Sequence, residues 1–397
     1  MSNRLMFEQA SPILARLEEE GFTAYYVGGA VRDFLLNRPI GDVDIATSAL
    51  PEEVKAVFPK TVDVGIEHGT VLVLWHGGGY EVTTFRTETD YKDFRRPETV
   101  SFVRTLEEDL QRRDFTINAM AMDRHGAIID PFDGKEALQS QQIKTVGCAE
   151  ERFSEDALRM MRAARFASQL GFHVEMETKQ ALKRCAHLLK HIAVERKLME
   201  MNKLLAGKET RAGLRVLLEG GLAPFLPGLD GEEDVLTKML SYDLSRLTLQ
   251  QKWLFLLVLL TPAAADQWLK AWRMPAKTIK YLTGTYEWFL QRGKDEWPVF
   301  SLYEAGVERA ADVEAVSALL AGRSAHIGPL EKRYADLPIK DRKELAVTGK
   351  ELKVWKNERG GPWMKSYLET IERAVVERKV ENSTEKIKEW LEACNLL

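Results

Sequence analysis

Two aspartates spaced two residues apart in a short apolar stretch are the first sign of chemistry in this chain. Asp42 and Asp44 lie in the segment PIGDVDIATSAL, residues 39–50. In an extended strand, residues i and i+2 point to the same side, so the two carboxylates repel each other unless a cation lies between them. An isolated Asp-x-Asp pair is usually a solvated edge strand or a helix cap. The neighbouring residues must therefore distinguish that alternative from a divalent-metal site.

A glycine turn precedes the aspartates in the segment YYVGGAVRDFLLNRPIGDVDIAT. Gly28 and Gly29 follow a predicted strand, and adjacent glycines let backbone N–H groups approach a phosphate closely. Arg32, one turn into the following helix, can add two hydrogen bonds to the same phosphate. Mg²⁺ prefers one or two carboxylates together with phosphate oxygens. The order and spacing therefore predict a metal–triphosphate site, with Asp42 and Asp44 as the Mg²⁺ ligands.

This string resembles the signature of the class II tRNA nucleotidyltransferases, which belong to the polymerase β-like superfamily with the CCA-adding enzymes and bacterial poly(A) polymerases. The resemblance extends over most of the chain, is strongest over residues 24–205, and is nearest to CCA-adding enzymes of Bacillus type. It implies that Gly29 and Arg32 contact the incoming nucleotide and that Asp42 and Asp44 bind Mg²⁺. It also implies a head that holds the metals and helical parts that hold tRNA.

A third carboxylate is common in this superfamily, and Glu81 in YEVTTFR is the candidate here. It opens a strand that is expected beside the two aspartates. The alternative, a solvent-facing strand end, is about equally consistent with the sequence.

The segment EEDLQRRDFTINAMAMD, residues 107–123, contains a second cluster of functional side chains. Arg113, more than Arg112, is expected to reach the triphosphate or ribose, with Asp114 orienting it and Asn118 bonding a sugar hydroxyl. Alone, Arg-Arg-Asp is more often a surface ion-pair cluster. The segment matches the R-R-D-F-x-x-N-A pattern of the family, which favours the nucleotide-binding role.

The segment RFSEDALRMMRAARF, residues 152–166, is predicted to lie on the first long helix after the head. Asp156, Arg159, Arg162 and Arg165 recur every three residues and would form one stripe on that helix. The simplest alternative is an intrahelical ion pair between the first two. The segment matches the E-D-x-x-R-x-x-R element, to which the family assigns the choice of nucleotide, and the last two arginines would support that pair or contact phosphates.

An Asp–Arg pair can distinguish nucleobases without a template. Cytosine and adenine both present an amino donor beside a ring-nitrogen acceptor, so Asp156 can accept from the amino group while Arg159 donates to the ring nitrogen. Uracil and guanine reverse both polarities. A buried charge that faces the wrong group costs more than the ~1–3 kcal/mol of one lost neutral partner. The pair is therefore expected to admit CTP and ATP and to reject UTP and GTP.

Three further segments resemble family elements. Residues 87–100 are polar and charged and match the loop that the family associates with the switch from C to A addition. The alternative interpretation is an ordinary surface loop. The segment DPFDG at 130–134 resembles a hinge between head and neck. Lysine-rich residues 336–371 resemble family tails that dock on the tRNA backbone.

Composition and pattern place these motifs in a protein of several parts. The 397 residues include 29% charged and 45% hydrophobic residues, typical of a globular protein. Short β-rich runs fill the chain up to about residue 147, and helical spacing follows to the end. We predict an α+β fold: a polymerase β-like nucleotidyltransferase head (1–146), then an all-α neck (147–206), body (207–310) and tail (311–397).

Charge and apolar runs limit the partners and the location. The head carries a net charge of −8 and residues 147–397 a net charge of +4, which makes the helical part the better candidate for binding phosphates. The longest apolar run, WLFLLVLL at 253–260, is much shorter than the ~20 residues of a membrane helix. Three scattered cysteines encode neither a disulfide framework nor a zinc site. A cytoplasmic protein without a membrane partner is predicted.

The sequence thus predicts an enzyme that adds C, C and A to the 3′ end of tRNA from CTP and ATP, with Mg²⁺ and release of pyrophosphate. The expected partner is the 3′ end and acceptor arm of tRNA, and a homodimer is plausible. A poly(A) polymerase of the same superfamily is the nearest alternative, and an enzyme adding only part of CCA is a weaker one. An inactive RNA-binding relative is expected to lack Asp42 or Asp44, and both are present.

Overall fold

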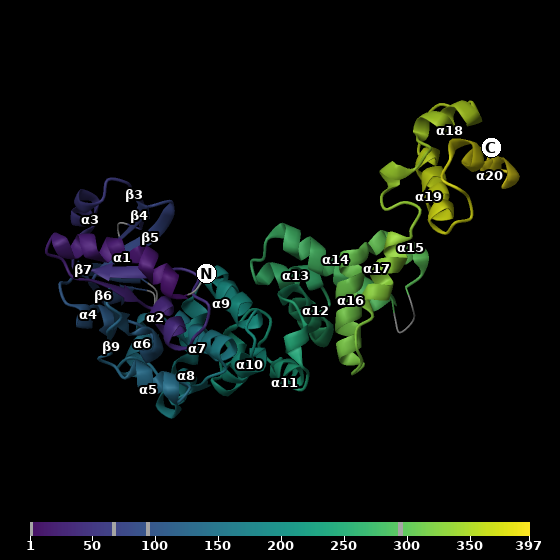
Figure 1. Ribbon diagram of the computed structural model, residues 1–397. Coiled ribbons are helices and arrows are strands. Elements are labelled where there is room, and N and C mark those ends of the chain that lie inside the picture. Colours follow the sequence, from purple (N-terminus) through teal and green to yellow (C-terminus); the bar gives the residue numbers. More distant parts are fainter. Residues whose placement is uncertain (1–2, 66–68, 93–95, 293–296) are drawn as a thin grey trace. The chain divides into compact units, whose positions relative to one another are not determined.

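The computed structural model describes residues 3–65, 69–92, 96–292 and 297–397. The chain divides into two compact units (Figure 1). The first contains residues 1–241 and 271–273, and the second contains residues 242–270 and 274–397. Head, neck, body and tail remain a finer division predicted from the sequence.

A seven-stranded mixed sheet forms the centre of the first unit, in the strand order β3-β4-β5-β2-β1-β8-β9. Strands β2 and β5 run parallel, and the other neighbours in this sheet are antiparallel. The strands are β1 (Ala24–Val27), β2 (Asp44–Thr47), β3 (Thr61–Gly65), β4 (Thr70–Trp75), β5 (Gly78–Thr84), β8 (Ala121–Met122) and β9 (Ile128–Ile129). Six of these strands lie wholly or mostly in runs that were predicted as β-rich, whereas the short strand β8 was not predicted.

Alternation along the strands separates a buried face of the sheet from the face that carries the acids. Ile45 of β2 and its partner Val82 of β5 are fully buried under the N-terminal helices. Successive residues of a strand point to opposite faces. The residues just before them, Asp44 and Glu81, therefore lie side by side on the other face. The register of two parallel strands brings together two carboxylates that are 37 positions apart.

Three helices cover the buried face: α1 (Asn3–Glu19), α2 (Gly29–Leu35) and α3 (Pro51–Val57). Leu14 and Leu17 of α1 and Val54 of α3 pack without exposure in the same apolar cluster as Ile45 and Val82. Burying such a side chain contributes about 1.5–3 kcal/mol, so this cluster holds β2 and its neighbours in place. Figure 1 shows α1 and α3 beside the sheet.

Helices follow the sheet in the remainder of the first unit. They are α4 (Leu106–Gln111), α5 (Gly134–Gln139), α6 (Ala149–Glu155), α7 (Leu158–Leu170), α8 (Met176–Cys185), α9 (Val194–Leu205), α10 (Thr210–Glu219) and α11 (Glu233–Leu240). Short 3₁₀ turns lie at Thr116–Asn118, Ala186–His191 and Ala223–Phe225, and β10 (Gln142–Ile143) pairs with β11 (His173–Val174). Helices α9 and α10 both pack against α7 (Figure 1).

The predicted single helix over residues 152–166 is wrong, because the chain breaks between α6 and α7. Asp156 adopts an extended conformation with φ −136° and ends α6. Its side chain instead accepts a hydrogen bond from the backbone N–H of Leu158 at 3.1 Å. Aspartate prefers such capping positions to helix interiors, because its carboxylate can bond unpaired N–H groups at a helix start.

The polar segment 87–100, predicted as a loop, falls largely within an antiparallel pair of strands. These are β6 (Arg86–Lys92) and β7 (Arg96–Phe102), and residues 93–95 lie outside the described residues. Polar composition alone does not separate a loop from a two-stranded ribbon.

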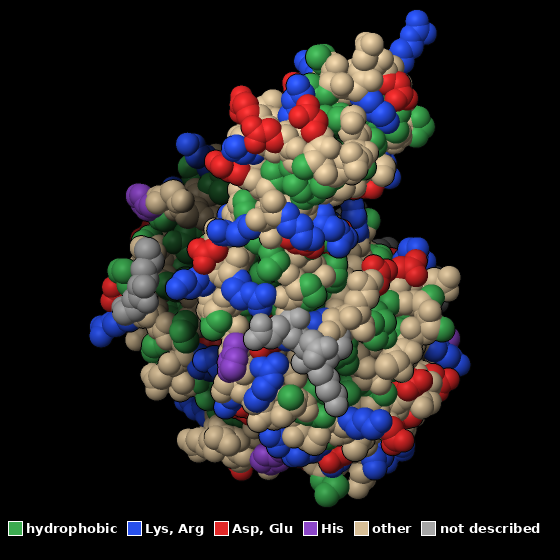
Figure 2. Space-filling model, turned by 90° about the vertical axis from the view of Figure 1, so that its right-hand side faces the viewer, with side chains coloured by type: hydrophobic (Ala, Val, Ile, Leu, Met, Phe, Trp, Pro, Cys, Tyr) green, Lys and Arg blue, Asp and Glu red, His purple; other side chains and the backbone are tan. Residues whose placement is uncertain are grey.

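The second unit is all-α over the residues that the structure describes. Its helices are α12 (Leu249–Leu260), α13 (Ala265–Ala271, whose last residue belongs to the first unit), α14 (Ala276–Arg292), α15 (Val299–Ala305), α16 (Val307–Leu320), α17 (Ile327–Ala335), α18 (Gly349–Lys356), α19 (Trp363–Val376) and α20 (Thr384–Ala393), with 3₁₀ turns at Leu244–Arg246 and Arg342–Glu344. The run WLFLLVLL lies in α12, and no helix in the described ranges is long and apolar enough to cross a membrane. Figure 2 shows basic and acidic side chains interspersed over the face that it presents.

Candidate active site

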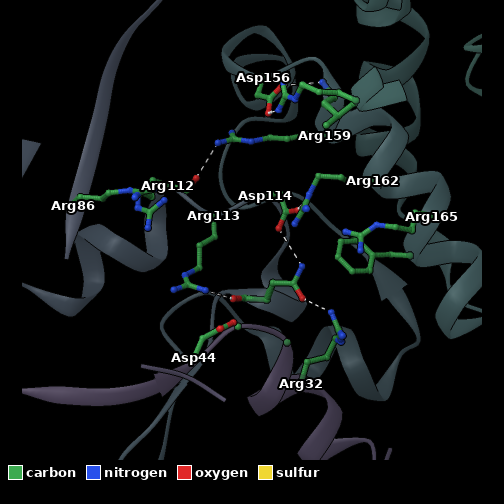
Figure 3. Close-up of a pocket in the computed structure, with 16 residues that line it drawn as sticks. Arg32, Asp44, Arg86, Arg112, Arg113, Asp114, Asp156, Arg159, Arg162 and Arg165 are labelled. Atoms are coloured by element: carbon green, nitrogen blue, oxygen red, sulfur yellow. Dashed lines mark hydrogen bonds and ion pairs between the residues drawn. The ribbon is translucent and has the colours of Figure 1, made fainter. Parts of the chain in front are cut away.

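A cavity of about 580 Å³ in the first unit brings together the side chains that the motifs predicted (Figure 3). It is lined by all ten predicted nucleotide-binding residues and by Asp44. Its walls come from the glycine turn, from the segment after α4, and from α7 and α9. The lining residues are Gly28, Gly29, Arg32, Asp44, Arg86, Arg112, Arg113, Asp114, Asn118, Asp156, Leu158, Arg159, Arg162, Arg165, Phe166 and Arg196.

The glycine turn between β1 and α2 requires glycine at its first position. Gly28 has φ +69°, a conformation that side chains disfavour. A Cβ built there would also lie 3.1 Å from Nη1 of Arg113 and 3.8 Å from Oδ2 of Asp44. The missing side chain therefore lets an arginine and a carboxylate approach the backbone together.

The predicted catalytic acids lie at the edge of this cavity, but they do not form a complete metal site by themselves. Asp42, Asp44 and Glu81 together line a neighbouring hollow, and Asp44 belongs to both spaces. Partial enclosure and the charges of Glu81 and Asp42 raise the pKa of Asp44, which the charge of Arg113 only partly offsets. In the described residues, no three histidine, cysteine or acidic side chains gather as a metal site.

Arg112 and Arg113 are held by a buried acid that the sequence did not single out. Asp109 of α4 is 1% exposed and accepts from Nη2 of Arg112 at 2.8 Å and Nη2 of Arg113 at 3.1 Å. It also accepts from the backbone N–H of Arg86 at 3.4 Å. Burial alone would raise the pKa of Asp109, but the two arginines lower it.

The prediction that Asp114 orients Arg113 is therefore wrong. Asp109 in the last turn of α4 binds Arg113, four residues further on, whereas Asp114 faces α7. Asp114 binds Nε of Arg162 at 2.5 Å and accepts from Nδ2 of Asn118 at 3.1 Å.

A chain of hydrogen bonds connects the glycine turn with α7. Nη1 of Arg32 donates to Oδ1 of Asn118 at 2.7 Å, Asn118 donates to Asp114, and Asp114 binds Arg162 (Figure 3). Asn118 is buried, and its amide is used at both ends. The predicted contact of Asn118 with a sugar hydroxyl remains a prediction, and its first role in this structure is to position Arg32.

The Asp114 pair gives a prediction for stability against pH. Burial would raise the pKa of Asp114, but the charge of Arg162 and its hydrogen bond lower it from 3.8 to about 2. Since the pKa is lower in the folded state, ionised Asp114 stabilises the fold above pH ~4, and the contribution disappears as pH falls toward 2. We expect Asp114→Asn to cost about 2 kcal/mol of unfolding free energy at pH 7. The difference should shrink between pH 4 and pH 2 in thermal melts, and a difference independent of pH would contradict this account.

Asp156 is paired with an arginine other than the predicted one. Its carboxylate binds Nη2 of Arg196 in α9 at 2.7 Å and Nη1 at 3.2 Å. The break between α6 and α7 removes Asp156 from the helical stripe, so the intrahelical pair with Arg159 does not form. With the cap to Leu158, three of the roughly four acceptor positions of a carboxylate are used, which leaves one on Oδ2.

The two remaining predicted arginines of α7 are also held by acids. Arg159 binds Oε2 of Glu155 at 2.5 Å and donates to the carbonyl of Arg112 at 3.0 Å. Arg165 binds Glu200 of α9 at 2.7 Å and lies 4.1 Å from the centre of the Phe166 ring. Burial and the nearby charge of Arg162 lower the pKa of Arg165 to about 10.

The cavity attracts anions because its charges are unbalanced. Eight arginines line it against three aspartates, and the guanidinium groups of three of these arginines, Arg32, Arg162 and Arg165, lie over the Phe166 ring. A triphosphate, with several oxygens that each accept from a guanidinium, matches this surplus of positive charge. Seven of these arginines are already paired with acids in or behind the lining, so their guanidinium groups are fixed in advance and bind such an anion with a smaller ordering cost.

The sequence analysis missed four residues that line the cavity and three acids that support it. The lining residues are Arg86, Leu158, Phe166 and Arg196, and the supporting acids are Asp109, Glu155 and Glu200. Of these, Asp109 carries a signal in retrospect, because it is a charged residue on the same side of α4 as its apolar residues. Asp109 is the buried member of the acidic run Glu107, Glu108 and Asp109. Their partners are distant in sequence or cross a helix end, so spacing alone did not identify them.

The fold and the site together define the class of protein. A mixed sheet carries paired acids beside a glycine turn and a basic cavity, and residues 24–144 match the family model described as "Poly A polymerase head domain". Residues 171–232 match the model for an RNA and SrmB binding site of polymerase A, and residues 247–391 match "tRNA nucleotidyltransferase domain 2". The chain is thus a nucleotidyltransferase with a polymerase-type head.

Similar proteins narrow the class further. The CCA-adding enzyme of Geobacillus stearothermophilus is 51% identical over 391 residues, 97% of this chain and 96% of its own length. That of Bacillus cereus (strain B4264) is 46% identical, over 98% of this chain and 99% of its own length. A crystal structure of the Bacillus stearothermophilus CCA-adding enzyme in complex with CTP matches with a TM-score of 0.91 and 48% identity, over 98% of this chain and 97% of that one. The chain belongs to the family of CCA-adding tRNA nucleotidyltransferases.

Proposed function

We propose that this enzyme adds C, C and A in turn to the 3′ end of tRNA, using CTP and ATP and releasing pyrophosphate. The observation that carries the proposal is the single cavity in which arginines for a triphosphate, the acid Asp44 and the base-reading candidate Asp156 converge. The relatives named above, including one solved with CTP, support these substrates.

The acids fit a divalent cation that arrives with its nucleotide. Asp42, Asp44 and Glu81 line one hollow, and enclosure together with the charges of Glu81 and Asp42 raises the pKa of Asp44. Mg²⁺ is commonly bound by one or two carboxylates together with substrate phosphates, which matches Asp42 and Asp44 without a third protein ligand. When bound, the metal would lower the pKa of the attacking hydroxyl and stabilise the charge of the leaving pyrophosphate. Glu81 remains a candidate third acid.

The residues of this chain hold the nucleotide for in-line displacement. Arg32, Arg113 and Arg162 bind the triphosphate, and the turn at Gly28 lets it approach the backbone. The 3′ oxygen of the RNA bonds to the α-phosphorus while the bond from that phosphorus to the bridging oxygen breaks. Pyrophosphate leaves with the bridging oxygen, and the hydroxyl proton passes to water. Positioning and charge supply most of the rate in such a reaction.

Selection of the base rests on Asp156 and Arg159. The acceptor position that remains on Oδ2 of Asp156 suits the amino group of cytosine or adenine, and Arg159 donates to the ring nitrogen beside it. Arg196 holds the Asp156 carboxylate in the orientation that this requires. Uracil and guanine would place a carbonyl against the carboxylate, which is why UTP and GTP are rejected.

The helical second unit is proposed to bind tRNA, since it carries the lysine-rich segment 336–371. In this segment Lys356 lies 4.7 Å from the ring centres of both Trp363 and Tyr367. A cytoplasmic location and a homodimer remain predictions from the sequence.

Extension of a defined RNA tests the proposed function. A tRNA that lacks its last three nucleotides is incubated with the protein and Mg²⁺, and with CTP, ATP or both, and the product lengths are read on a sequencing gel. We expect growth by two residues with CTP alone and by three with both nucleotides, followed by a stop. A long ladder with ATP alone would instead identify a poly(A) polymerase, and no extension under any condition would favour an inactive RNA-binding relative.

A further inference from the structure

A buried carboxylate in the second unit joins three elements that are distant in the sequence. Glu372 of α19 is 5% exposed, and both of its oxygens accept hydrogen bonds. Oε1 accepts from Oη of Tyr303 in α15 at 2.6 Å, and Oε2 accepts from Nε of Arg342 at 2.8 Å and from Nη2 of the same arginine. A charge that is withdrawn from water is costly unless such partners satisfy it. Glu372 is therefore stable in its place only while α15 and the turn at Arg342–Glu344 pack against α19.

Apolar and aromatic contacts complete the junction between α15 and α19. Phe300 and Tyr303 of α15 pack against the apolar cluster that includes Ile371 of α19. The guanidinium of Arg373 lies 4.1 Å from the centre of the Phe300 ring. Burial and the hydrogen bond to the carboxylate raise the pKa of Tyr303, so its hydroxyl keeps the proton that it donates at neutral pH. The two helices thus share an interface that one phenol and one carboxylate hold in register.

This junction encloses the lysine-rich segment 336–371. Arg342 lies near the start of the segment, and Glu372 follows its last residue. The exposed lysines between the two are Lys343, Lys350, Lys353 and Lys365. The bonds from Arg342 to Glu372 close the segment on itself, and the bond from Tyr303 attaches it to α15. A single carboxylate therefore sets both the shape of the basic segment and its direction relative to α15.

A fixed direction matters for binding a long RNA. Lysines bind a phosphate backbone without reading its sequence, so their placement decides which part of the RNA they reach. A basic segment that is free to turn is competent only part of the time, and its apparent affinity falls in proportion to that fraction. We propose that Tyr303, Arg342 and Glu372 are positioning residues for tRNA, which hold the lysine-rich segment ready for the RNA backbone beyond the reacting 3′ end. This inference rests on the proposed function and deepens it.

Removal of one hydroxyl tests the proposed role. Tyr303→Phe deletes the bond to Glu372 but keeps the aromatic packing of α15 on α19. KM is measured for CTP, for tRNA lacking its last three nucleotides, and for a hairpin that carries only the acceptor stem. We expect KM for tRNA to rise about three- to tenfold, with kcat and the other two KM values within about twofold of the original protein. The hairpin is unaffected because it lacks the rest of the backbone that the segment is proposed to bind.

The same unit offers a chemically matched control. Oη of Tyr281 in α14 donates to Oδ2 of Asp312 in α16 at 2.7 Å, so Tyr281→Phe also removes a phenol–carboxylate bond. This pair lies outside the lysine-rich segment. Tyr281→Phe should lower the melting temperature about as much as Tyr303→Phe and leave every KM unchanged. Glu372→Gln, which keeps the shape of the side chain but removes its charge, should raise KM for tRNA at least as much as Tyr303→Phe.

A distance measurement gives a readout that does not depend on RNA. Nitroxide labels are attached at Glu331→Cys of α17 and Ser366→Cys of α19, both at exposed positions, with the exposed Cys148 and Cys394 replaced by serine. Pulsed electron paramagnetic resonance then reports the distribution of distances between the labels. We expect Tyr303→Phe to broaden this distribution and the control variant to leave it unchanged.

The outcomes separate this inference from the proposed function. If the unaltered protein extends no RNA, the proposed function fails, and the positioning role fails with it whatever the label distances show. If it extends RNA but Tyr303→Phe leaves KM for tRNA unchanged, raises KM for the hairpin equally, or behaves like Tyr281→Phe, only the positioning role is overturned. An unbroadened distance distribution would overturn it too, because the segment would then keep its direction without the hydroxyl.

Discussion

Asp44→Asn is expected to reduce the rate of CTP incorporation by about a thousandfold or more, without loss of stability. The amide keeps the shape of the side chain but removes the charge that would hold the metal, and such charge stabilisation contributes several kcal/mol to the transition state. The raised pKa of Asp44 shows that its ionised form is disfavoured in the folded protein by enclosure and by Glu81. Removal of this charge should therefore leave the melting temperature unchanged or slightly higher.

Single-turnover incorporation, thermal melting and CTP binding in EDTA check this prediction together. Asp63→Asn is a suitable control, because Asp63 lies in the same sheet on β3, is exposed, and pairs with Lys55. CTP binding in EDTA should persist in Asp44→Asn, since the arginines hold the triphosphate without the metal. Incorporation within tenfold of the original protein would show that Asp44 is not a metal ligand.

The site is built from buried acids that fix arginines before the substrate arrives. Asp109 holds Arg112 and Arg113, and Glu200 holds Arg165. A buried ion pair contributes little to stability on average, because both charges lose their hydration. These pairs are better explained as a means of fixing the orientation of each guanidinium, which lowers the ordering cost when a triphosphate binds.

The parts of the site that the sequence predicted are those governed by local geometry. The glycine turn and the β-rich runs before residue 147 follow from turn chemistry and from alternation with a period of two. Of the two aspartates expected on one strand, only Asp44 lies in β2, and Asp42 precedes it. The confirmed fold class follows from the change from alternating to helical periodicity at the same point. Such signals need only a few neighbouring residues.

The parts that the sequence did not predict depend on partners distant in the chain or on competition at helix ends. Asp156 was assigned to Arg159 three residues on, but capping of α7 competes with helix continuation and turns Asp156 toward Arg196. Asp114 was assigned to Arg113 beside it, but it binds Arg162, 48 positions away. An ion pair between residues close in sequence can be expected only when no other charged element packs against them. Here α7 and α9 supply competing arginines.

Asp156→Asn is expected to shift the choice of nucleotide toward UTP, and Asp156→Ala is expected to weaken the discrimination between UTP and CTP. Asparagine keeps an oxygen that can cap Leu158 but gains an amide N–H donor. This donor can bond to the carbonyl of uracil, whereas the carboxylate of Asp156 repels that carbonyl. We expect the ratio of UTP to CTP incorporation to rise by about ten- to a hundredfold in Asp156→Asn. Asp156→Ala should raise it less and lower kcat/KM for CTP, because no polar group then reads the base.

Loss of the helix cap must be separated from loss of base reading. Glu175→Ala serves as the control, since Glu175 caps α8 through Thr178 at 2.8 Å and does not line the cavity. It should cost about 1 kcal/mol of stability without changing the UTP to CTP ratio. Kinetics with single nucleotides on tRNA lacking its last three residues, together with melting curves, distinguish the two effects.

Arg196→Met extends the same argument to the residue that holds Asp156. With Arg196 replaced, the carboxylate keeps its cap to Leu158 but loses two hydrogen bonds that fix its plane. KM for both CTP and ATP should therefore rise, with a smaller loss of selectivity than in Asp156→Asn. If all three variants kept the original UTP to CTP ratio, the base would have to be read by groups other than this carboxylate. The first candidates would then be Arg159 and the backbone carbonyls beside it, with which it already forms hydrogen bonds.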